Sequence, residues 1–245
     1  MIKNILIVTW NQDWHQCSNM LIPSISKFIP GANIKIVDTT FHTPSPIIAP
    51  SFSNITYEVL PAIQLLETLE PWKGDNHNEG WMYQQMCKLA GYKLFDSEFV
   101  VLDSELVILR KFDKWPTYCR LTASNTHFNK FIEYASARLN IDCEGHCFLE
   151  PCVPYILDPK ILKEIVSTFG SFAELYKWFS THSEPSEFIL YDLFKYRKDL
   201  QQDINNQNIH ESPVIQFIID NKPYVLDSRY DFALINRDTY RNFGK

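Results

Sequence analysis

The chain has 245 residues and a formal net charge of −6, so it can bury a sizeable core and has no overall basic character. The acidic balance argues against nucleic acid as a partner, because nucleic acid favours a basic face. Seven glycines leave little room for an extended glycine-rich phosphate loop. The opening apolar run of about five residues is too short for a signal peptide or a membrane span. With six scattered cysteines, we predict a cytoplasmic, reduced protein without a membrane span.

Strand and helix patterns alternate from the start of the chain. Residues 4–10 and 33–40 have the composition of strands, and residues 12–29 between them have the apolar spacing of a helix. Pro23 is expected to kink that helix. A strand, a helix and a strand in fewer than forty residues predict a βαβ unit and therefore a parallel sheet.

The rest of the chain continues the same α/β pattern. The proline- and serine-rich residues 41–54 predict a loop, and residues 71–80 predict a flexible connection. Further elements are expected in this order: a helix over 81–95, a strand with a short interruption over 96–112, a strand running into a helix over 152–169, a helix over 186–200, and mixed strands and turns over 212–244. Asp158 and Pro159 have the residue types of an N-cap and a first helical position.

Several polar residues follow the predicted strands. Ligands of parallel sheets bind beyond the carboxyl ends of the strands. Thr9, Trp10 and Asp13 follow the first strand, and Asp38 closes the second. These four residues are therefore candidates for contact with a ligand. Trp10 is equally compatible with a core position, and Asp38 with a cap on the following turn.

Two acids interrupt the apolar segment "FVVLDSELVILR", residues 99–110. If the strand continues through them, Asp103 and Glu105 share a face and lie about 7 Å apart. Two carboxylates this close repel unless a proton or a cation lies between them. Mg²⁺ and Mn²⁺ prefer such oxygen ligands, and Ser104 can add a hydroxyl. The alternative is that the strand ends at Leu102 and both acids lie in an exposed turn.

The segment "GWMYQQMCKLAGYKLFDSEFVVLDSELVILR", residues 80–110, resembles the central block of GT-A-fold glycosyltransferases, in which a helix precedes a strand ending in an Asp-x-Asp motif. It is most similar to a bacterial and viral group with "LDSD" or "LDAD" at that place. The segments "VTWNQDWHQCSNMLIPSI", "PYILDPKILKEI" and "PSEFILYDLF" also resemble this group, so the likeness covers most of residues 3–200. Glu105 departs from the pattern, which has Asp there.

The resemblance implies a single GT-A-like domain, with a mixed, mainly parallel sheet flanked by helices. Residues 1–110 would form the nucleotide-sugar-binding half, 111–200 the acceptor half and 201–245 a C-terminal section. It also implies roles for individual residues. The nucleotide would contact Thr9, Trp10, Asp13 and Asp38. The rest of the donor would contact Gln84, Gln85, Lys88, Asp103 and Ser104, with Trp81 and Tyr83 either walling the donor sugar or packing.

A divalent cation, Mn²⁺ or Mg²⁺, would be held by Asp103 and Glu105, with Asp103 also able to reach the ribose and His210 as a third ligand. Glu187 would be the general base toward the acceptor, if the transfer inverts the sugar. Two simpler interpretations stay open. Lys88 fits a solvated helix face, and Glu187 fits an acid near a helix N-terminus after Ser186.

The function expected from this resemblance is metal-dependent transfer of a hexose or pentose from a nucleotide-diphosphate donor, a UDP-sugar, to a hydroxyl of a carbohydrate or glycoconjugate. Three alternatives stay open. One is a carbohydrate-binding or scaffold protein of the same fold without catalysis. Another is a transferase acting on a modified base in viral DNA. The third is a nucleotidyltransferase, although "TWNQDWHQ" lacks the glycine and basic residues expected after its first strand. The cytoplasm of a bacterial or virus-infected cell is the expected location.

Overall fold

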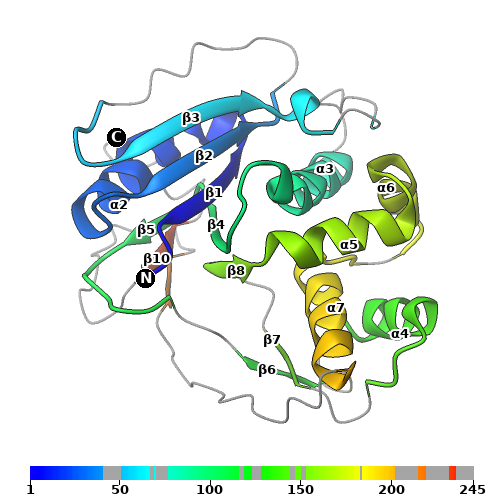
Figure 1. The fold of residues 1–245 in the computed structure, drawn as a ribbon. Helices are drawn as coiled ribbons and strands as arrows, with labels where there is room; N and C mark the ends of the chain where they lie inside the picture. The colour runs from blue at the N-terminus through cyan, green and yellow to red at the C-terminus, as the bar shows by residue number, and fades with distance from the viewer. Residues whose placement is uncertain are drawn as a thin grey trace.

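The large sheet of the protein has five strands in the order β3-β2-β1-β4-β8 (Figure 1). The structure is a computed structural model that describes residues 1–40, 51–66, 69, 77–115, 119–122, 128–143, 147–149, 153–182, 184–201, 215–218 and 232–235. The strands of the large sheet are β1 (Asn4–Thr9), β2 (Asn33–Asp38), β3 (Thr56–Pro61), β4 (Phe99–Asp103) and β8 (Tyr155–Leu157). The first four are parallel and β8 is antiparallel to β4. This confirms the predicted α/β class with a mixed, mainly parallel sheet.

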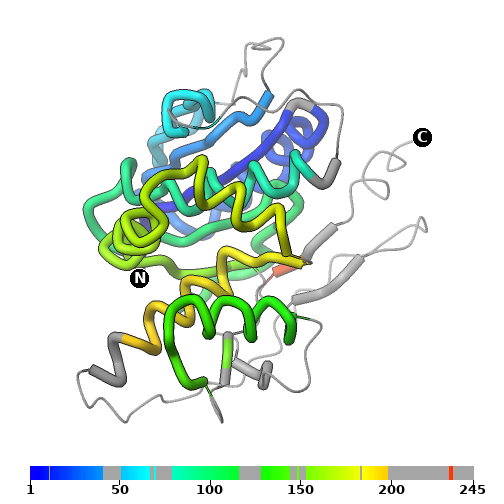
Figure 2. Tube along the Cα trace, turned by 90° about the vertical axis from the view of Figure 1, so that its right-hand side faces the viewer, coloured from blue at the N-terminus to red at the C-terminus, as the bar shows by residue number. Residues whose placement is uncertain are grey.

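Helices cover both sides of this sheet. The bounds of the α-helices are α1 (Trp14–Gln16), α2 (Ile22–Phe28), α3 (His77–Leu89), α4 (Asn129–Leu139), α5 (Pro159–Phe169), α6 (Phe172–Ser180) and α7 (Glu187–Gln201). Figure 2 shows α2 and the pair α5 and α6 on opposite sides of the strands. None of the described helices is long and apolar enough to cross a membrane.

Smaller elements complete the described part of the chain. Short 3₁₀ turns are η1 (Asn11–Asp13), η3 (Ala62–Gln64) and η4 (Ala90–Lys93). The remaining strands are β5 (Leu106–Ile108), β6 (Cys119–Thr122), β7 (Cys147–Leu149), β9 (Ile215–Ile218) and β10 (Phe232–Ile235). They form two further sheets, one in the order β5-β10-β9 and one that pairs β6 with β7.

The central strands are apolar because both of their faces are covered. In β1, Ile5, Leu6 and Ile7 are fully buried, and in β4 the same holds for Val100 and Leu102. A parallel strand with helices on both sides excludes polar side chains along its length, so polar residues collect where the strands end. The functional residues of this fold are therefore expected at the strand ends.

The predicted helix over 12–29 is confirmed, but its geometry is not uniform. The segment η2 (Cys17–Leu21) is a π-helix, in which the backbone N–H of Ile22 donates to the carbonyl of Cys17. This wider turn directly precedes α2, so Pro23 falls in the first turn of α2. A proline there lacks an N–H that an α-helix interior would need, and a single π turn accommodates the irregularity without ending the helix.

The start of α5 agrees with the sequence, whereas the bounds of α3 differ from those predicted. Asp158 is the N-cap of α5, and its side chain accepts a hydrogen bond from the Lys160 N–H at 2.8 Å. Helix α3 begins at His77, inside the segment expected to be a flexible connection, and gives way at Leu89 to η4. No element was predicted at the positions of β3, β6, β7, α4 and α6.

At Gly91, η4 packs closely against the sheet near the start of β4. A Cβ at this position would fall on the ring of Phe99 and lie 3.1 Å from Leu6 Cδ2. Gly91 therefore lets η4 pack directly against β1 and β4, and this contact fixes the height of α3 relative to the strands.

We expect Gly91→Ala to destabilise the protein by about 1–3 kcal/mol, because the added methyl group overpacks the core. Equilibrium denaturation with urea measures the change. Adding Phe99→Leu should recover part of the loss, since it removes the ring that the new Cβ meets. Strictly additive effects of the two substitutions would contradict this account.

Candidate active site

Three polar residues lie side by side at the carboxyl edge of the large sheet. In the parallel pairing of β1 with β2, Thr9 is opposite Asp38, and in the pairing of β1 with β4, Val8 is opposite Asp103. The strand ends of β2, β1 and β4 are therefore level, as the sequence predicts for a βαβ fold. Open α/β sheets bind their ligands beyond this edge.

The two acids of the motif do not share one extended strand. β4 ends at Asp103, Ser104 and Glu105 form a turn, and β5 begins at Leu106. The structure agrees with the predicted strand with a short interruption, and it rules out the arrangement in which one continuous strand carries both carboxylates on one face. The reason is that β5 pairs with β10 in a different sheet, so the chain has to leave the large sheet directly after Asp103. Ser104 is buried, and both Asp103 and Glu105 are partly exposed.

Lys88 joins the end of β4 to the start of α7. Its ammonium lies 3.2 Å from Asp103 Oδ1 and 3.1 Å from Glu187 Oε1. Lys88 and Glu187 are both buried, with exposed fractions of 6% and 3%, whereas Asp103 has its side chain open to solvent on one side. A buried cation with two carboxylate partners holds its neighbours firmly, since separating either pair leaves a charge without compensation.

Gln85 extends this network away from the ion pairs. A carboxylate only accepts and an indole N–H only donates, so the amide nitrogen of Gln85 faces Glu187 and its oxygen faces Trp81. In this orientation Gln85 donates to both carboxylate oxygens of Glu187 and accepts from Trp81 Nε1 at 2.9 Å. A continuous chain of polar contacts therefore runs from Trp81 through Gln85, Glu187 and Lys88 to Asp103.

The charges in this network shift each other's protonation. Burial alone lowers the pKa of Lys88, but the carboxylates of Asp103 and Glu187 outweigh it and raise that pKa above its ordinary value. Burial raises the pKa of Glu187, and the nearby Lys88 opposes the shift without cancelling it. Lys88 is therefore a cation at neutral pH, and Glu187 takes up a proton more easily than an exposed glutamate.

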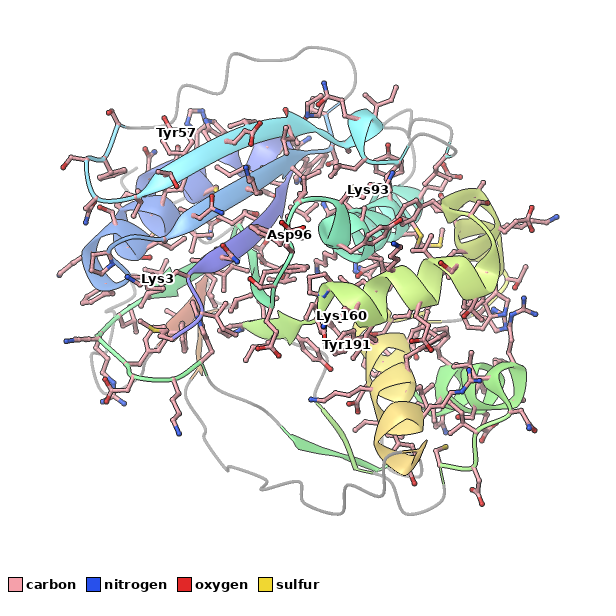
Figure 3. The ribbon with its side chains drawn as sticks, viewed as in Figure 1. Lys3, Tyr57, Lys93, Asp96, Lys160 and Tyr191 are labelled. Carbon is pink, nitrogen blue, oxygen red and sulfur yellow. The ribbon has the colours of Figure 1, made fainter. Side chains whose placement is uncertain are left out.

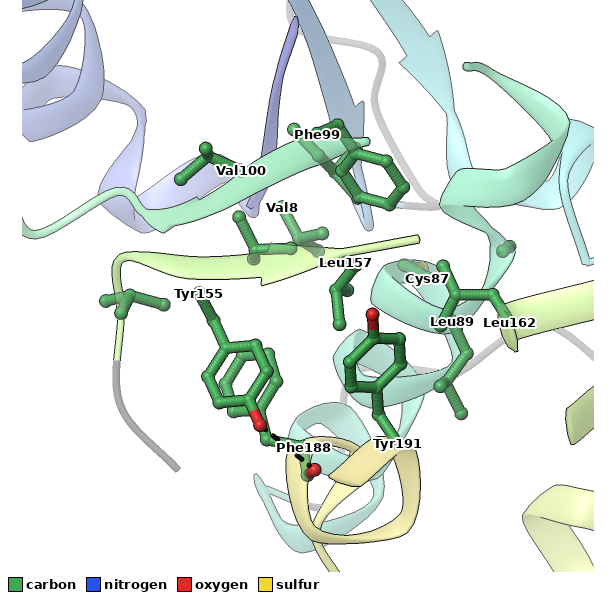
Figure 4. Close-up of a cluster of buried hydrophobic side chains, with 14 of the residues drawn as sticks. Val8, Cys87, Leu89, Phe99, Val100, Tyr155, Leu157, Leu162, Phe188 and Tyr191 are labelled. Atoms are coloured by element: carbon green, nitrogen blue, oxygen red, sulfur yellow. Dashed lines mark hydrogen bonds between the residues drawn. The ribbon is translucent and has the colours of Figure 1, made fainter. Parts of the chain in front are cut away.

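The residues on either side of Glu187 fix the start of α7, one by capping the helix and the other by stacking on β8. Ser186 Oγ accepts a hydrogen bond from the Ile189 N–H at 3.3 Å, so Ser186 performs the capping and leaves Glu187 to Lys88 and Gln85. The next residue, Phe188, stacks on Tyr155 with ring centroids 4.2 Å apart (Figure 4). Lys88 Nζ lies 5.0 Å from the Phe188 ring centroid.

A second contact docks α7 onto the sheet. Tyr191 OH accepts a hydrogen bond from the Asp158 N–H at 2.9 Å, and Figure 3 shows Tyr191 close to Lys160 at the start of α5. Tyr155 OH in turn donates to the Phe188 carbonyl at 3.4 Å. These aromatic residues place the first turn of α7 opposite the end of β4.

The residues at and after the ends of β1 and β2 form local hydrogen bonds with one another. The Trp10 indole N–H donates to the Asp13 carboxylate, and the Asp13 N–H donates to the Trp10 carbonyl at 3.0 Å. Trp10 is half-buried and Asp13 is buried. Asp38 accepts from the Thr40 N–H at 2.8 Å, which is the turn-capping role left open by the sequence. Thr9 is buried, and its carbonyl accepts from the Thr39 N–H at 2.9 Å.

Two predicted residues stand apart from the network. Gln84 is half-exposed, whereas its neighbour Gln85 is buried. His210, the third predicted metal ligand, lies outside the described residues.

The acids at the end of β4 fit a divalent cation of the Mg²⁺ or Mn²⁺ type. Within the described ranges, no group of three or more His, Cys, Asp or Glu residues could hold a metal. Asp103 and Glu105 nevertheless offer partly exposed carboxylates, and Mg²⁺ is commonly bound by one or two carboxylates together with substrate phosphates and water. The donor set therefore suits a cation that arrives with a phosphorylated ligand.

The sequence identified the members of the network but not their contacts. For Lys88 the sequence left open contact with the donor and a place on a solvated helix face. For Gln84 and Gln85 it predicted the same contact with the donor. Helical spacing could not separate the two glutamines, because Gln84 and Gln85 precede Lys88 by four and three residues and either spacing allows a shared face. Nothing in the local sequence shows that Glu187 meets Gln85 or Lys88, because they are far apart in the chain.

Comparison with known proteins finds a matching family and similar solved structures. The model of a protein family described as "Family of unknown function (DUF6492)" matches residues 8–238. The crystal structure of the galactosyltransferase LgtC, solved in complex with donor and acceptor sugar analogs, is similar with a TM-score of 0.44 and 11% sequence identity. That similarity covers 78% of this chain and 70% of the LgtC chain. No curated protein matches.

We expect Lys88→Met to destabilise the protein by about 3–5 kcal/mol at pH 7, because it leaves Glu187 buried without its cation. Without Lys88 the pKa of Glu187 rises further. The unfolded state then ionises at a lower pH than the folded state, so the free energy of unfolding falls as pH rises through the raised pKa.

Denaturant titrations at pH 5 and pH 8 measure this effect, and the loss relative to wild type should be larger at pH 8. Adding Glu187→Gln should restore part of the stability, since no charge is then buried alone. The exposed Lys163 provides a control, as Lys163→Met should change stability little at either pH. An equal loss at both pH values would show that burial of the Glu187 charge is not the cause.

Proposed function

The chain belongs to the family DUF6492, whose model spans residues 8–238, and for this member of the family we propose the function of a metal-dependent glycosyltransferase. It moves a sugar from a nucleotide-diphosphate donor, a UDP-sugar, to a hydroxyl of a carbohydrate or glycoconjugate. The observation that carries the proposal is the double ion pair of Lys88, which gathers the terminal acid of β4 and the first acid of α7 at the carboxyl edge of the sheet. The GT-A-like motifs of the sequence supply the reaction class.

The donor would lie along the ends of β2, β1 and β4. Its nucleoside would contact Thr9, Trp10, Asp13 and Asp38, and its diphosphate would lie beside Asp103 and Ser104. Trp10 offers an aromatic face on which a base can stack. The hydrogen bond of its indole N–H to Asp13 fixes the orientation of that face. Gln84, half-exposed on α3, would contact the sugar from the other side.

Asp103 and Glu105 would hold Mn²⁺ or Mg²⁺, with His210 as a further ligand. When bound, such an ion supplies positive charge beside the departing diphosphate. Lys88 adds a second, permanent positive charge on the protein side, because its raised pKa keeps it protonated. Asp103 keeps one side open to solvent while Lys88 holds its Oδ1, so the carboxylate can serve both cations without leaving its place.

Glu187 would act as the base that accepts the proton of the attacking hydroxyl. It lies next to Asp103 through their shared partner Lys88, and its pKa is raised by burial. A base whose pKa is nearer to neutral accepts a proton more readily from a hydroxyl. Gln85 and Lys88 orient its carboxylate, so little reorganisation is needed when the acceptor binds.

The first test is thermal unfolding against UDP, GDP, CDP and ADP, each with Mn²⁺ and with chelator. A ligand at about a hundred times its dissociation constant stabilises the native state by about 2.7 kcal/mol, which corresponds to a rise in Tm of about 5 °C or more for a chain of this size. We expect this rise with UDP only when Mn²⁺ is present, and we expect Asp103→Asn and Glu105→Gln to abolish it.

The control is Glu98→Gln, which changes an exposed acid just before β4 and should leave the UDP shift intact. If the shift survives Glu105→Gln, Glu105 is not a metal ligand. If no nucleotide shifts the midpoint with or without metal, the transferase proposal fails and a non-catalytic carbohydrate-binding protein replaces it.

The second test concerns Glu187. The release of UDP from the best-binding UDP-sugar should rise with pH through a pKa above the ordinary range of glutamate, because only the ionised carboxylate accepts a proton. Glu187→Gln should lower kcat by about 10²–10⁴ and remove this pH dependence. Glu184→Gln, at an exposed site three residues earlier, is the matched control. A Glu187→Gln variant with the wild-type pH profile would assign Glu187 a positioning role through Lys88 instead.

A further inference from the structure

Trp81 is a large aromatic residue exposed at the rim of the polar network. Its exposed fraction is 38%, whereas Tyr83 two residues later is buried at 1%. Trp81, Gln85 and Lys88 follow one another at intervals of four and three residues, so they lie along one face of α3. The deeper residues of that face form the network, and its outermost residue reaches the surface.

The indole of Trp81 is oriented by the network rather than left free. Its N–H donates to the Gln85 amide oxygen at 2.9 Å, and the other end of that amide donates to Glu187. The single polar atom of the side chain is thus satisfied inside the protein. What Trp81 presents to solvent is apolar ring surface in a fixed orientation, and hydration of that surface is unfavourable.

This ring lies toward the carboxyl edge of the sheet, beyond which open α/β sheets bind their ligands. Gly91 packs against Phe99 at the start of β4, while Lys88 reaches Asp103 at its end. Helix α3 therefore runs antiparallel to β4, and its N-terminal residues extend past the strand end. At 1.5 Å per residue, the backbone of Trp81 lies about 10 Å further along the helix than that of Lys88, beyond the carboxyl edge.

We propose that Trp81 is the platform on which a substrate sugar ring stacks. This inference rests on the proposed transferase function and adds the contact that selects a pyranose. One face of a pyranose consists largely of C–H groups, which gain from leaving water against a flat aromatic surface. Its hydroxyls remain at the edge of the ring, where they can meet the polar residues of the site.

The polar network links the stacked sugar ring to Glu187, the acid assigned as the base. Gln85 contacts Trp81 at one end and Glu187 at the other, so a sugar on the indole is held one amide away from the acid assigned as the base. Both the donor sugar and the acceptor sugar present the same C–H face. The chemistry therefore identifies a sugar ring, and the experiment decides which substrate carries it.

The test compares wild type with Trp81→Ala and Trp81→Phe by titration calorimetry in the presence of Mn²⁺. The probes are UDP alone, UDP-glucose, UDP-galactose and UDP-N-acetylglucosamine, and the methyl glycosides of the same three sugars added to the UDP complex. We expect Trp81→Ala to leave UDP affinity unchanged and to weaken the sugar-bearing probe by about tenfold or more. Trp81→Phe keeps an aromatic face and should lose less.

The two sources of the ring give different patterns. Weaker binding of the UDP-sugars places the donor sugar on Trp81, and weaker binding of the glycosides places the acceptor there. Tyr134→Ala removes another exposed aromatic residue, 51% exposed on α4, and should change neither.

Unchanged binding of every sugar probe by Trp81→Ala, with UDP still bound, would overturn the platform while leaving the transferase proposal intact. Failure of wild type to bind UDP at all would overturn both.

Discussion

The site depends on one buried cation. Lys88 is buried on α3, lies over the Phe188 ring and pairs with Asp103 and Glu187. Burying an ammonium costs several kcal/mol unless its partners are well placed. The positions of β4 and α7 are therefore coupled, because each supplies one of the carboxylates that make the burial tolerable. The aromatic contacts of Tyr155 and Tyr191 support that geometry but do not replace it.

Local patterns in the sequence were sufficient for the framework of the fold. The alternation of β1, the first helix and β2 was predicted because hydrophobic period is a property of neighbouring residues. The Asp158 cap was predicted for the same reason. The π turn at Cys17–Leu21 was not, since it depends on how a proline-bearing helix is packed. The interruption after Asp103 was predicted, but the pairing of β5 with the strand at residues 232–235 was not, because that strand lies far away in the chain.

The candidate site shows the same limit. Asp103, Lys88, Gln85 and Glu187 were each selected from the sequence, largely through a resemblance to GT-A enzymes. Their mutual contacts were not predictable, because the choice between a solvated lysine and a buried one depends on whether an acid from another helix reaches it. The distinction between Gln84 and Gln85 similarly depends on which face of α3 meets α7. The site residues could thus be selected from local sequence motifs, whereas the pairing of their charges depends on the tertiary fold.

The bridge between β4 and α7 also has a consequence for biosynthesis. Ribosomes deliver the N-terminal part of a chain first, and early segments can fold before later ones emerge. Helix α3 and β4 are close in sequence and leave the ribosome together, with Lys88 and Asp103 already able to pair. Glu187 follows only after α4, α5 and α6 have been made. A nascent chain therefore carries a partly assembled, solvent-accessible charge cluster until α7 docks, and the site is completed only late in synthesis.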